Sequence, residues 1–366
     1  MLHAIIMAGG AGTRFWPISR SGTPKQLLPL AGSRTLIQAA VDRLAGLVAP
    51  EQTLIVTGEN LADGIRRQLP QLPPQAILAE PCRRDTAPCI GLAAFQISQQ
   101  DPQATLLVMP ADHYIGPADR FRAALAHAAE LVESAPVRIA TIGISPTYPA
   151  ESFGYIERGE RLEPTAADQQ AAQPAAYRVK QFREKPQAEV AQQYLDSGNF
   201  FWNSGIFIWK ASTILAALQR HQPALHARLA TIAAAYGSDD YTHVLRREFA
   251  AIQGISIDYA VMEHATDVVM IEAPFEWDDV GSWQALSRLH GPDANGNTIL
   301  APRHIGWQTS GSIVRGEPGH LIATLGVSDL IIVHTPDATL VANKHDEESI
   351  RKLVKLLEER GWTEWL

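Results

Sequence analysis

Short apolar runs alternate with longer amphipathic stretches through the first half of the chain. The apolar runs read as buried strands: His3–Met7, Thr53–Thr57, Ala76–Ala79, Thr105–Met109 and Arg138–Ile144. The stretches between them have helical periodicity: Thr35–Leu47, Asn60–Leu69, Ala87–Gln99 and Asp119–Ser134. This alternation predicts a doubly wound α/β domain. Ligands bind at the carboxyl ends of the strands in such a domain, which directs attention to the residues after Met7 and Met109.

The second half of the chain has a looser pattern. We expect strands at Tyr177–Glu184, Asn203–Trp209 and Val268–Glu272, helices up to about Phe249, and a short helix at Trp283–His290. Pro164–Pro174 is rich in Ala, Gln and Pro and predicts an exposed loop or insertion. Beyond Gly296, short strand candidates lie between turns: Ser312–Val314, Leu321–Thr324, Leu330–His334 and Thr339–Ala342. We therefore predict a domain of residues 1–290 and a small β-rich module of residues 291–366.

A helix is expected to end that module. Its opening residues carry negative charge, and its closing residues are Arg360 and Gly361. The acids at its start are Asp346, Glu347 and Glu348. The predicted apolar face is Ile350, Leu353, Val354 and Leu357. The module is compatible with two roles, a homodimer contact or an intramolecular cap.

Composition and charge exclude several classes of protein. Lys and Arg number 31 against 39 Asp and Glu, a net charge of −8, which disfavours nucleic-acid binding. The two cysteines, Cys82 and Cys89, are no disulfide framework and suit a reducing compartment. No apolar run approaches the length of a membrane span or a signal-peptide core. We expect a cytoplasmic protein with no membrane partner.

A glycine-rich turn follows the first strand. It reads Met7-Ala8-Gly9-Gly10-Ala11-Gly12-Thr13-Arg14, and Pro24-Lys25-Gln26 comes soon after it. Backbone N–H groups in such a turn can approach phosphate oxygens, Arg14 can fork across two of them, and Lys25 adds a point charge. The third glycine of a dinucleotide fingerprint and the Gly-Lys-Ser/Thr of a Walker loop are both missing. A plain tight turn is the simplest alternative, but the added Arg and Pro-Lys pair favour a cradle for a triphosphate.

This region resembles a known family. Gly9 to Pro17, with Pro24-Lys25-Gln26, closely resembles the signature of sugar-1-phosphate nucleotidylyltransferases, and Trp16-Pro17-Ile18-Ser19-Arg20 resembles the mannose-1-phosphate guanylyltransferase branch. The resemblance implies a Rossmann-like, GT-A-like mixed sheet. It also implies that Arg14 and Lys25 contact the nucleotide phosphates. The nucleotide-binding residues of the turn would be Ala8, Gly9, Gly10, Gly12 and Thr13.

Acidic residues follow two of the motifs. Asp112 comes just after a buried strand in Pro110-Ala111-Asp112-His113, and Asp278 and Asp279 lie in Trp277 to Trp283. Mg²⁺ (magnesium) takes one or two carboxylates plus phosphate and water, so a dispersed pair suffices. Taken alone, Asp112 would be a helix cap and Asp278 a solvated turn residue. The resemblance implies that Asp112 and Asp279 hold the metal.

The segment Glu80 to Pro88 is the candidate base pocket. A carboxylate at Glu80 could accept hydrogen bonds from guanine N1–H and the 2-amino group, although a charged surface turn is an alternative. Thr86 is expected to cap the following helix, with Pro88 in its first turn. The family more usually has Asn where this chain has Asp85. Neither cysteine has the neighbours of a zinc site.

The sugar pocket is assigned by resemblance. Phe182 to Pro186 resembles a family strand in which glutamate binds sugar hydroxyls and lysine meets the sugar phosphate, here Glu184 and Lys185. Asn203 lies in a matching asparagine motif, and Gly154 is a glycine where a pyranose must approach backbone. Taken alone, the Glu184–Lys185 pair would be a solvated ion pair. The aromatic residues around Asn203 would be core rather than a ligand stack.

These ordered motifs, spread between Met1 and Leu289, together imply one reaction. The resemblance implies transfer of GMP from GTP to mannose 1-phosphate, giving GDP-mannose and pyrophosphate. Arg14, Lys25, Asp112, Asp279 and Lys185 would be the catalytic residues. Another hexose 1-phosphate as substrate, a dinucleotide-dependent oxidoreductase and a non-catalytic nucleotide-sugar sensor stay open. Because the chain stops at Leu366, we expect no cupin-like isomerase domain and no isomerase activity.

Overall fold

The structure is a computed structural model, and it describes residues 1–10, 12–163 and 173–366. These residues divide into two compact units. The first comprises residues 1–9, 41–111 and 115–277, and the second comprises residues 10–40, 112–114 and 278–366. Both units are assembled from several segments. Because each unit combines segments from different parts of the chain, these units do not test a boundary placed at residue 290, and that boundary stays a prediction.

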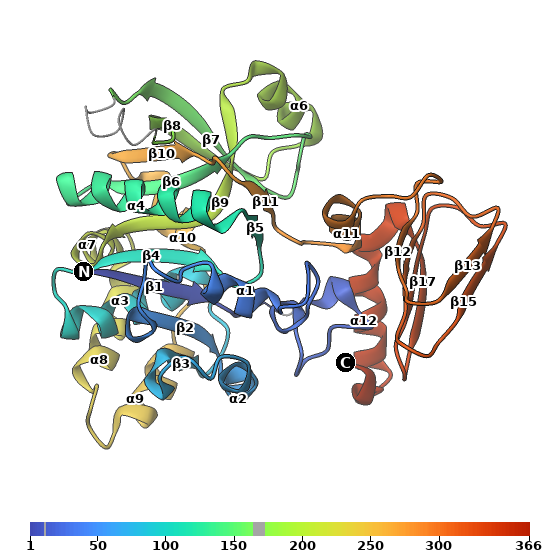
Figure 1. The fold of residues 1–366 in the computed structure, drawn as a ribbon. Helices are drawn as coiled ribbons and strands as arrows, with labels where there is room; N and C mark the ends of the chain where they lie inside the picture. The colour runs from blue at the N-terminus through green and yellow to red at the C-terminus, as the bar shows by residue number, and fades with distance from the viewer. Residues whose placement is uncertain (11, 164–172) are drawn as a thin grey trace. The chain divides into compact units, whose positions relative to one another are not determined.

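A nine-stranded mixed sheet forms the centre of the first unit (Figure 1). Its order is β3-β2-β1-β4-β9-β6-β10-β8-β7. The parallel part consists of β1 (Leu2–Met7), β2 (Thr53–Gly58), β3 (Ile77–Glu80) and β4 (Thr105–Pro110). The other strands are β6 (Ile139–Ile144), β7 (Gly154–Arg161), β8 (Ala176–Glu184), β9 (Phe200–Lys210) and β10 (Val268–Glu272). Of these, β6 and β10 pair in parallel, while β9 runs antiparallel to β4, β6 and β7.

Helices cover this sheet. Their bounds are α2 (Glu59–Gln68), α3 (Thr86–Gln100), α4 (Ala118–Ser134), α6 (Ala188–Ser197), α7 (Ala211–His221), α8 (Pro223–Ala234), α9 (Tyr241–Ala250) and α10 (Ile257–Ala260). Short 3-10 turns lie at Pro50–Gln52, Pro74–Ala76 and Met262–His264. Helix α3 packs on β1 and β2, and α4 packs on β4, β6 and β9.

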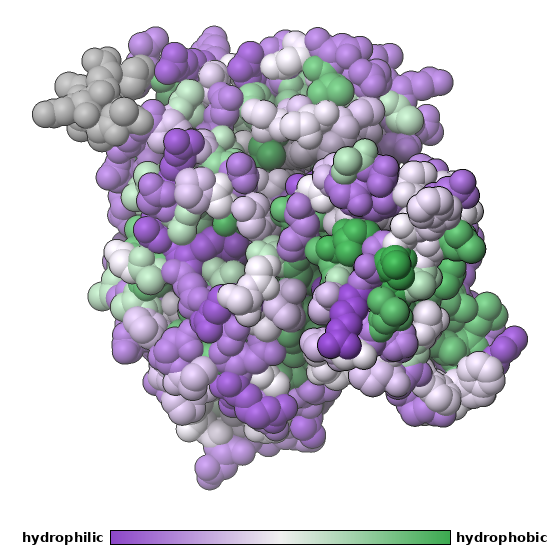
Figure 2. Space-filling view, turned by 45° about the vertical axis from the view of Figure 1, so that its right-hand side comes forward, coloured by the Kyte–Doolittle hydropathy of each residue, from purple (hydrophilic) through white to green (hydrophobic). Residues whose placement is uncertain are grey.

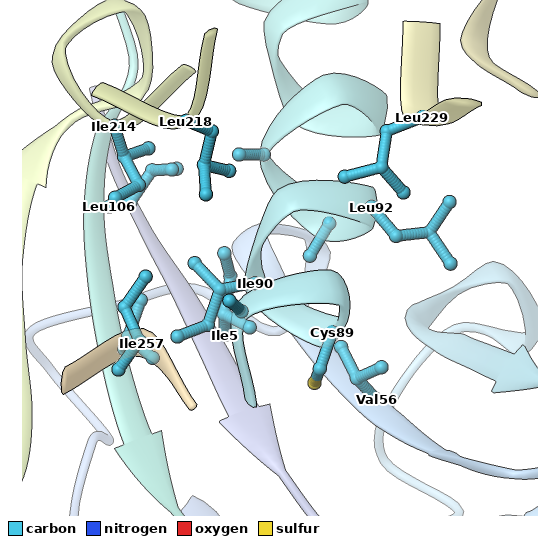
Figure 3. Packing of buried hydrophobic residues seen from close by; sticks show 14 of the residues in the cluster. Ile5, Val56, Cys89, Ile90, Leu92, Leu106, Ile214, Leu218, Leu229 and Ile257 are labelled. Carbon is cyan, nitrogen blue, oxygen red and sulfur yellow. The ribbon is translucent and has the colours of Figure 1, made fainter. Parts of the chain in front are cut away.

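The main apolar core joins α3 to the parallel strands. In Figure 3, Cys89, Ile90 and Leu92 of α3 lie among side chains of β1, β2 and β4, with residues of α7 and α8 beyond them. Gly91 marks the closest helix contact, because a Cβ there would lie 2.5 Å from Leu229 and 3.0 Å from Leu218. This burial fixes the carboxyl ends of the strands, where the candidate site residues begin.

The second unit combines the signature turn with the C-terminal strands. Its strands are β12 (Thr298–Leu300), β13 (His304–Trp307), β14 (Ile313–Arg315), β15 (Ile322–Leu325), β16 (Leu330–His334) and β17 (Thr339–Asn343). They form a four-stranded sheet, β12-β14-β16-β17, and a parallel pair, β13 and β15.

Short helices complete this unit. The α-helices are α11 (Trp283–His290), α12 (Ile350–Glu359) and most of α1 (Leu36–Asp42), with 3-10 turns η1 (Thr13–Phe15), η2 (Lys25–Leu27), η6 (Lys344–Ser349) and η7 (Thr363–Trp365). One further strand pair joins β5 (Tyr114–Gly116) to β11 (Glu276–Asp278).

A single apolar cluster holds the second unit together. Phe15 and Trp16 from the signature turn, Trp283 from α11, and Ile350 and Val354 from α12 share this cluster. The rings of Phe15 and Trp283 lie 5.2 Å apart. The helix at the end of the chain therefore packs against the turn near its start.

Apolar side chains also reach the surface in several places on the face shown in Figure 2. On β13 and β15 the exposed residues are in register, Ile305 opposite Ala323 and Trp307 opposite Leu325. Trp307 is 70% exposed and Leu325 is 72% exposed. None of the described helices has the length and apolar character needed to cross a bilayer.

The predicted fold class is confirmed, and so are its principal strands and helices. Three details are wrong. Helix α1 ends at Asp42 rather than Leu47. Helix α12 begins at Ile350, so the acids that precede it lie in η6. Leu353 is 37% exposed because it lies at the edge of the apolar stripe made by Ile350, Val354 and Leu357. Most of the predicted loop Pro164–Pro174 lies outside the described residues.

Candidate active site

Gly12 gives the signature turn its shape. The residue has φ +62° and precedes η1, and a Cβ there would lie 2.6 Å from the Lys25 backbone nitrogen. Its carbonyl accepts hydrogen bonds from Phe15 N at 3.0 Å and Ser19 Oγ at 2.7 Å. Only glycine fits both the conformation and the space. The turn thereby brings residues 12–15 against Lys25.

Lys25 brings the two predicted metal acids together. Its Nζ lies 2.9 Å from Asp112 Oδ2 and donates to the Asp279 carbonyl at 2.9 Å. The Lys25 residue is only 9% exposed, so its charge acts in poorly hydrated surroundings. Gly10 borders the same place, because a Cβ there would lie 3.8 Å from Asp112 Oδ2. Turn, lysine and both acids therefore form one cluster, which we call the phosphate cluster (Gly10, Gly12, Lys25, Asp112 and Asp279).

The two acids of the phosphate cluster differ electrostatically. Burial acts to raise the pKa of Asp112, but the nearby Lys25 and His113 outweigh it, and the pKa is lowered. Burial also raises the pKa of Asp279, and there Lys25 offsets it only in part. The ionised form of Asp112 is consequently favoured. A further positive charge beside Asp279 would favour its ionised form as well.

Asp278 and Asp279 are adjacent but have separate surroundings. Asp278 is buried and its carboxylate accepts from Arg288 Nε at 2.5 Å and from Val280 N at 2.8 Å. The alternative that Asp278 is a solvated turn residue is therefore wrong. Asp112 is no helix cap either, because β5 follows it and α4 begins only at Ala118. The carboxylate of Asp278 belongs to a structural ion pair, which supports the choice of Asp279.

Arg14 lies in η1, beside Thr13. Its Nη1 donates to the Gly281 carbonyl at 3.3 Å, and its Nε lies 2.9 Å from Glu348 Oε1. Its side chain is 28% exposed, so part of the guanidinium meets solvent. These contacts engage Nε and Nη1, and Nη2 makes no hydrogen bond or ion pair with the described residues, so it can bind an anion.

The predicted base pocket lies in the first unit. The strand β1 ends at Met7, Ala8 N donates to Val56 O at 2.8 Å, and Ala8 O accepts from Thr57 Oγ1 at 3.1 Å. Glu80, the last residue of β3, is buried, and burial raises its pKa to about 8. Its buried Oε1 has no hydrogen-bond partner among the described residues. A buried carboxyl oxygen without a partner can accept a hydrogen bond from a ligand.

The start of α3 differs from the prediction. Asp85, not Thr86, is the N-cap, with φ +67° and its Oδ1 accepting from Thr86 N at 2.7 Å. Thr86 Oγ1 instead accepts from Ile257 N at 2.8 Å, so it ties α3 to α10. Pro88 lies buried in the first turn of α3, as expected. The Asp85 carboxylate accepts a hydrogen bond from a backbone N–H at the start of α3, and its negative charge suits the N-terminus of a helix.

The predicted sugar residues form a second cluster. Gly154 and Glu184 are directly paired across β7 and β8. A Cβ at Gly154 would lie 2.5 Å from Glu184 Oε2 and 3.4 Å from Asn203 Cβ, so the three positions meet. Lys185 Nζ lies 3.0 Å from Glu184 Oε1, a contact that raises the pKa of Lys185. The aromatic residues of this region were expected to be core, and four of them, Phe201, Trp202, Phe207 and Trp209, are buried, whereas Phe200 is half-buried.

Asp258 joins this sugar cluster and was not predicted. Its Oδ1 accepts from Asn203 Nδ2 at 2.9 Å. Burial, with the charge of Glu184 nearby, raises the pKa of Asp258 to about 6. The sequence gives no local signal for it, since Asp258 is 55 residues from Asn203 and lies in the short helix α10.

A family model described as nucleotidyl transferase matches residues 3–295. The chain belongs to the nucleotidyl transferase family. A second model, described as a MannoseP isomerase/GMP-like beta-helix domain, matches residues 302–357.

Several relatives match this nucleotidyl transferase over almost its whole length. The mannose-1-phosphate guanylyltransferase of Escherichia coli K12 is 37% identical over 365 residues, covering 98% of this chain and 74% of its own. Mannose-1-phosphate guanylyltransferase ManC of Salmonella typhimurium gives the same identity and coverage. The crystal structure of a Thermus thermophilus protein named mannose-1-phosphate geranyltransferase has a TM-score of 0.85 and 36% identity, covering 98% of this chain and 99% of that one. The family resemblance read from the motifs is confirmed.

The residues of this nucleotidyl transferase fit a Mg²⁺ ion. Asp112 supplies a carboxylate oxygen and Asp279 a backbone carbonyl to the buried Lys25 ammonium, and the buried Asp279 side chain adds a second carboxylate, whose pKa is raised by that burial. Carboxylate oxygens are the hard ligands that Mg²⁺ takes from a protein. Among the described residues, no group of three or more His, Cys, Asp and Glu side chains is arranged to hold an ion without outside ligands. The site suits an ion that arrives with phosphate oxygens of its own.

Proposed function

We propose that the chain transfers GMP from GTP to α-D-mannose 1-phosphate, giving GDP-mannose and pyrophosphate. The phosphate cluster is the observation that carries the proposal. A buried lysine, a glycine turn and two acids are what a triphosphate with its counterion requires. The relatives named mannose-1-phosphate guanylyltransferases support the choice of base and sugar.

The reaction is a single displacement. A phosphate oxygen of mannose 1-phosphate forms a bond to the α-phosphorus of GTP, and the bond from that phosphorus to the α–β bridging oxygen breaks. Pyrophosphate leaves with the electron pair of that bond. The nucleophile belongs to the substrate, so the chain acts by positioning and by electrostatic stabilisation.

Each group of residues has a part in this scheme. Lys25 and the Nη2 edge of Arg14 bind the phosphates that leave as pyrophosphate. Asp112 and Asp279 would hold Mg²⁺, which neutralises charge on the phosphates when bound. Glu184 and Asn203, with Asp258 behind Asn203, bind sugar hydroxyls, and Lys185 binds the sugar phosphate.

Glu80 is proposed to select guanine. Its unpartnered Oε1 is buried, and guanine presents two adjacent donors, N1–H and the 2-amino group. Adenine presents an acceptor at N1 beside one amino group, so unlike guanine it cannot donate two hydrogen bonds to the ionised carboxylate.

A matrix of nucleotides and sugar phosphates tests this function. Pyrophosphate release is measured for GTP, ATP and UTP against mannose, glucose and galactose 1-phosphates, with Mg²⁺ or with a chelator. We expect the highest kcat/KM for GTP with mannose 1-phosphate, and none with the chelator. Highest turnover with another hexose phosphate would reassign the sugar. No pyrophosphate from any pair would contradict transfer itself.

We also propose a cytoplasmic homodimer. Both cysteines are free, as a reducing compartment favours. Helix α12 buries its apolar stripe within its own unit, which leaves the exposed apolar row of β13 and β15 for a second copy.

A further inference from the structure

The C-terminal elements contact the signature region at three residues, Arg14, Trp16 and Arg20. Trp16 Nε1 donates to the Trp365 carbonyl at 2.8 Å. Arg20 Nη2 donates to both carboxylate oxygens of Asp337, at 3.0 and 3.1 Å. Arg14 Nε lies 2.9 Å from Glu348 Oε1 in η6. All of these residues belong to the second unit, so its C-terminal part braces the turn that carries the phosphate ligands.

The Arg14 contact differs from the others because it reaches a proposed catalytic group. A guanidinium is planar, so a hydrogen bond at Nη1 and an ion-pair contact at Nε together restrict the direction in which Nη2 points. The Nε contact acts by charge, because Nε forms no hydrogen bond among the described residues. Glu348 supplies the ion-pair contact, and the Gly281 carbonyl accepts the hydrogen bond. Glu348 is itself held, because its Oε2 lies 3.7 Å from Arg351 Nη1 on α12.

We propose that Glu348 is a positioning residue for the nucleotide site. Its carboxylate orients the Arg14 guanidinium so that Nη2 meets the GTP phosphates, and the C-terminal helix region thereby takes part in transfer. The proposal rests on the proposed function of Arg14.

If Glu348 instead competed with the GTP phosphates for Arg14, it would weaken GTP binding. The Glu348 side chain is 64% exposed, so water screens its charge from a nearby anion. Its contact with Arg14 Nε, in contrast, is only 2.9 Å long, and the Arg14 side chain is 28% exposed, so this attraction is screened less. The observations therefore favour orientation over competition.

Substitutions at Glu348 test the proposal. We expect Glu348→Ala to lower kcat/KM for GTP by about 10-fold, since one anchor of Arg14 is lost. Glu348→Gln keeps the size of the side chain but removes its charge, and because Arg14 Nε forms no hydrogen bond to Glu348 it should lose nearly as much activity as Glu348→Ala. Glu359→Ala, which removes a carboxylate from an exposed i,i+4 pair on α12, is the matched control and should change nothing. Because the Arg14–Glu348 pair is partly exposed, the melting temperature should be unchanged in every variant.

A double-mutant cycle with Arg14→Ala identifies the route of the effect. If Glu348 acts through Arg14, then Glu348→Ala costs less than about 2-fold in the Arg14→Ala background. A full 10-fold loss there, or a gain in GTP affinity in Glu348→Ala alone, would overturn the proposal. Wild-type protein that neither binds GTP nor releases pyrophosphate would instead remove the proposed function, and the role of Glu348 with it.

Discussion

Asp278 and Asp279 are neighbours in sequence with different chemistry. The carboxylate of Asp278 is used by Arg288, whereas burial raises the pKa of Asp279 and Lys25 offsets this only in part. The sequence motif singled out Asp279 by resemblance, and the ion pair of Asp278 gives that choice a physical reason. A motif cannot show which of two adjacent acids is already paired.

Asp279→Asn should lower activity without lowering the stability of the fold. We expect kcat/KM to fall at least about 100-fold, because a ligand for the charge on the phosphates is lost. Because the folded pKa is raised, ionising Asp279 costs stability as the pH rises through that pKa, and Asn removes the cost. The melting temperature at neutral pH should therefore be equal to wild type or higher.

Asp278→Asn is the matched control. It weakens the ion pair between the buried Asp278 carboxylate and Arg288, whose side chain is 40% exposed, so the unfolding free energy should fall by about 1 kcal/mol and the melting temperature with it. If Asp278→Asn abolished turnover while folded and Asp279→Asn did not, the assignment of the two acids would be reversed.

Glu80 gives a pH-dependent prediction. Its pKa is 4.5 in the unfolded chain and about 8 when folded, so its contribution to stability is present below pH 4.5 and lost as the pH rises to 8. Glu80→Gln should therefore raise the unfolding free energy at pH 8 by up to about 4 kcal/mol relative to wild type, with little change near pH 4. Chemical denaturation at the two pH values measures this.

The same substitution tests guanine recognition. Two guanine donors stabilise the carboxylate, so GTP binding to wild type at pH 7 should release up to one proton, measured by calorimetry in buffers of different ionisation enthalpy. Glu80→Gln should release none and prefer GTP over ATP less strongly. An unchanged GTP preference would place base recognition elsewhere.

At the scale of elements, the regular strands were predictable because a continuous apolar run can be buried only between two layers. Strand β7 was missed because its residues are largely half-exposed. The short strands β5, β11, β12 and β13 were not predicted either. The role of Thr86 could not be predicted, since its partner Ile257 is 171 residues away. Asp258 and Glu348 were missed for the same reason: long-range contacts leave no local pattern.

The signature turn provides an element-scale prediction. Gly12→Ala places a Cβ 2.6 Å from Lys25 N at φ +62°, so the turn must shift. We expect a loss of about 1–3 kcal/mol in unfolding free energy and at least about a 100-fold loss of kcat/KM, as Lys25 moves from Asp112. Gly9→Ala is the control for stability, because nothing lies within 4 Å of a Cβ there. Equal stability of Gly12→Ala and wild type would contradict the turn geometry.

At the scale of the whole molecule, the exposed row on β13 and β15 predicts self-association. Sedimentation should give a dimer mass for wild type and a monomer mass for Leu325→Asp, with an unchanged melting temperature because Leu325 is 72% exposed. Val341→Asp, on the other C-terminal sheet and 61% exposed, should stay dimeric. A monomeric wild type, or dissociation by both variants alike, would contradict the assignment of this face.

The fate of the α-phosphate of GTP shows whether the protein transfers GMP. The protein is incubated with GTP labelled at the α-phosphorus, mannose 1-phosphate and Mg²⁺, and the products are separated. Transfer of GMP predicts all transferred label in GDP-mannose, unlabelled pyrophosphate in equal amount, and no turnover in Lys25→Ala or Asp279→Asn. Label released as free GMP, or retained in GTP while the phosphate cluster is intact, would contradict the account.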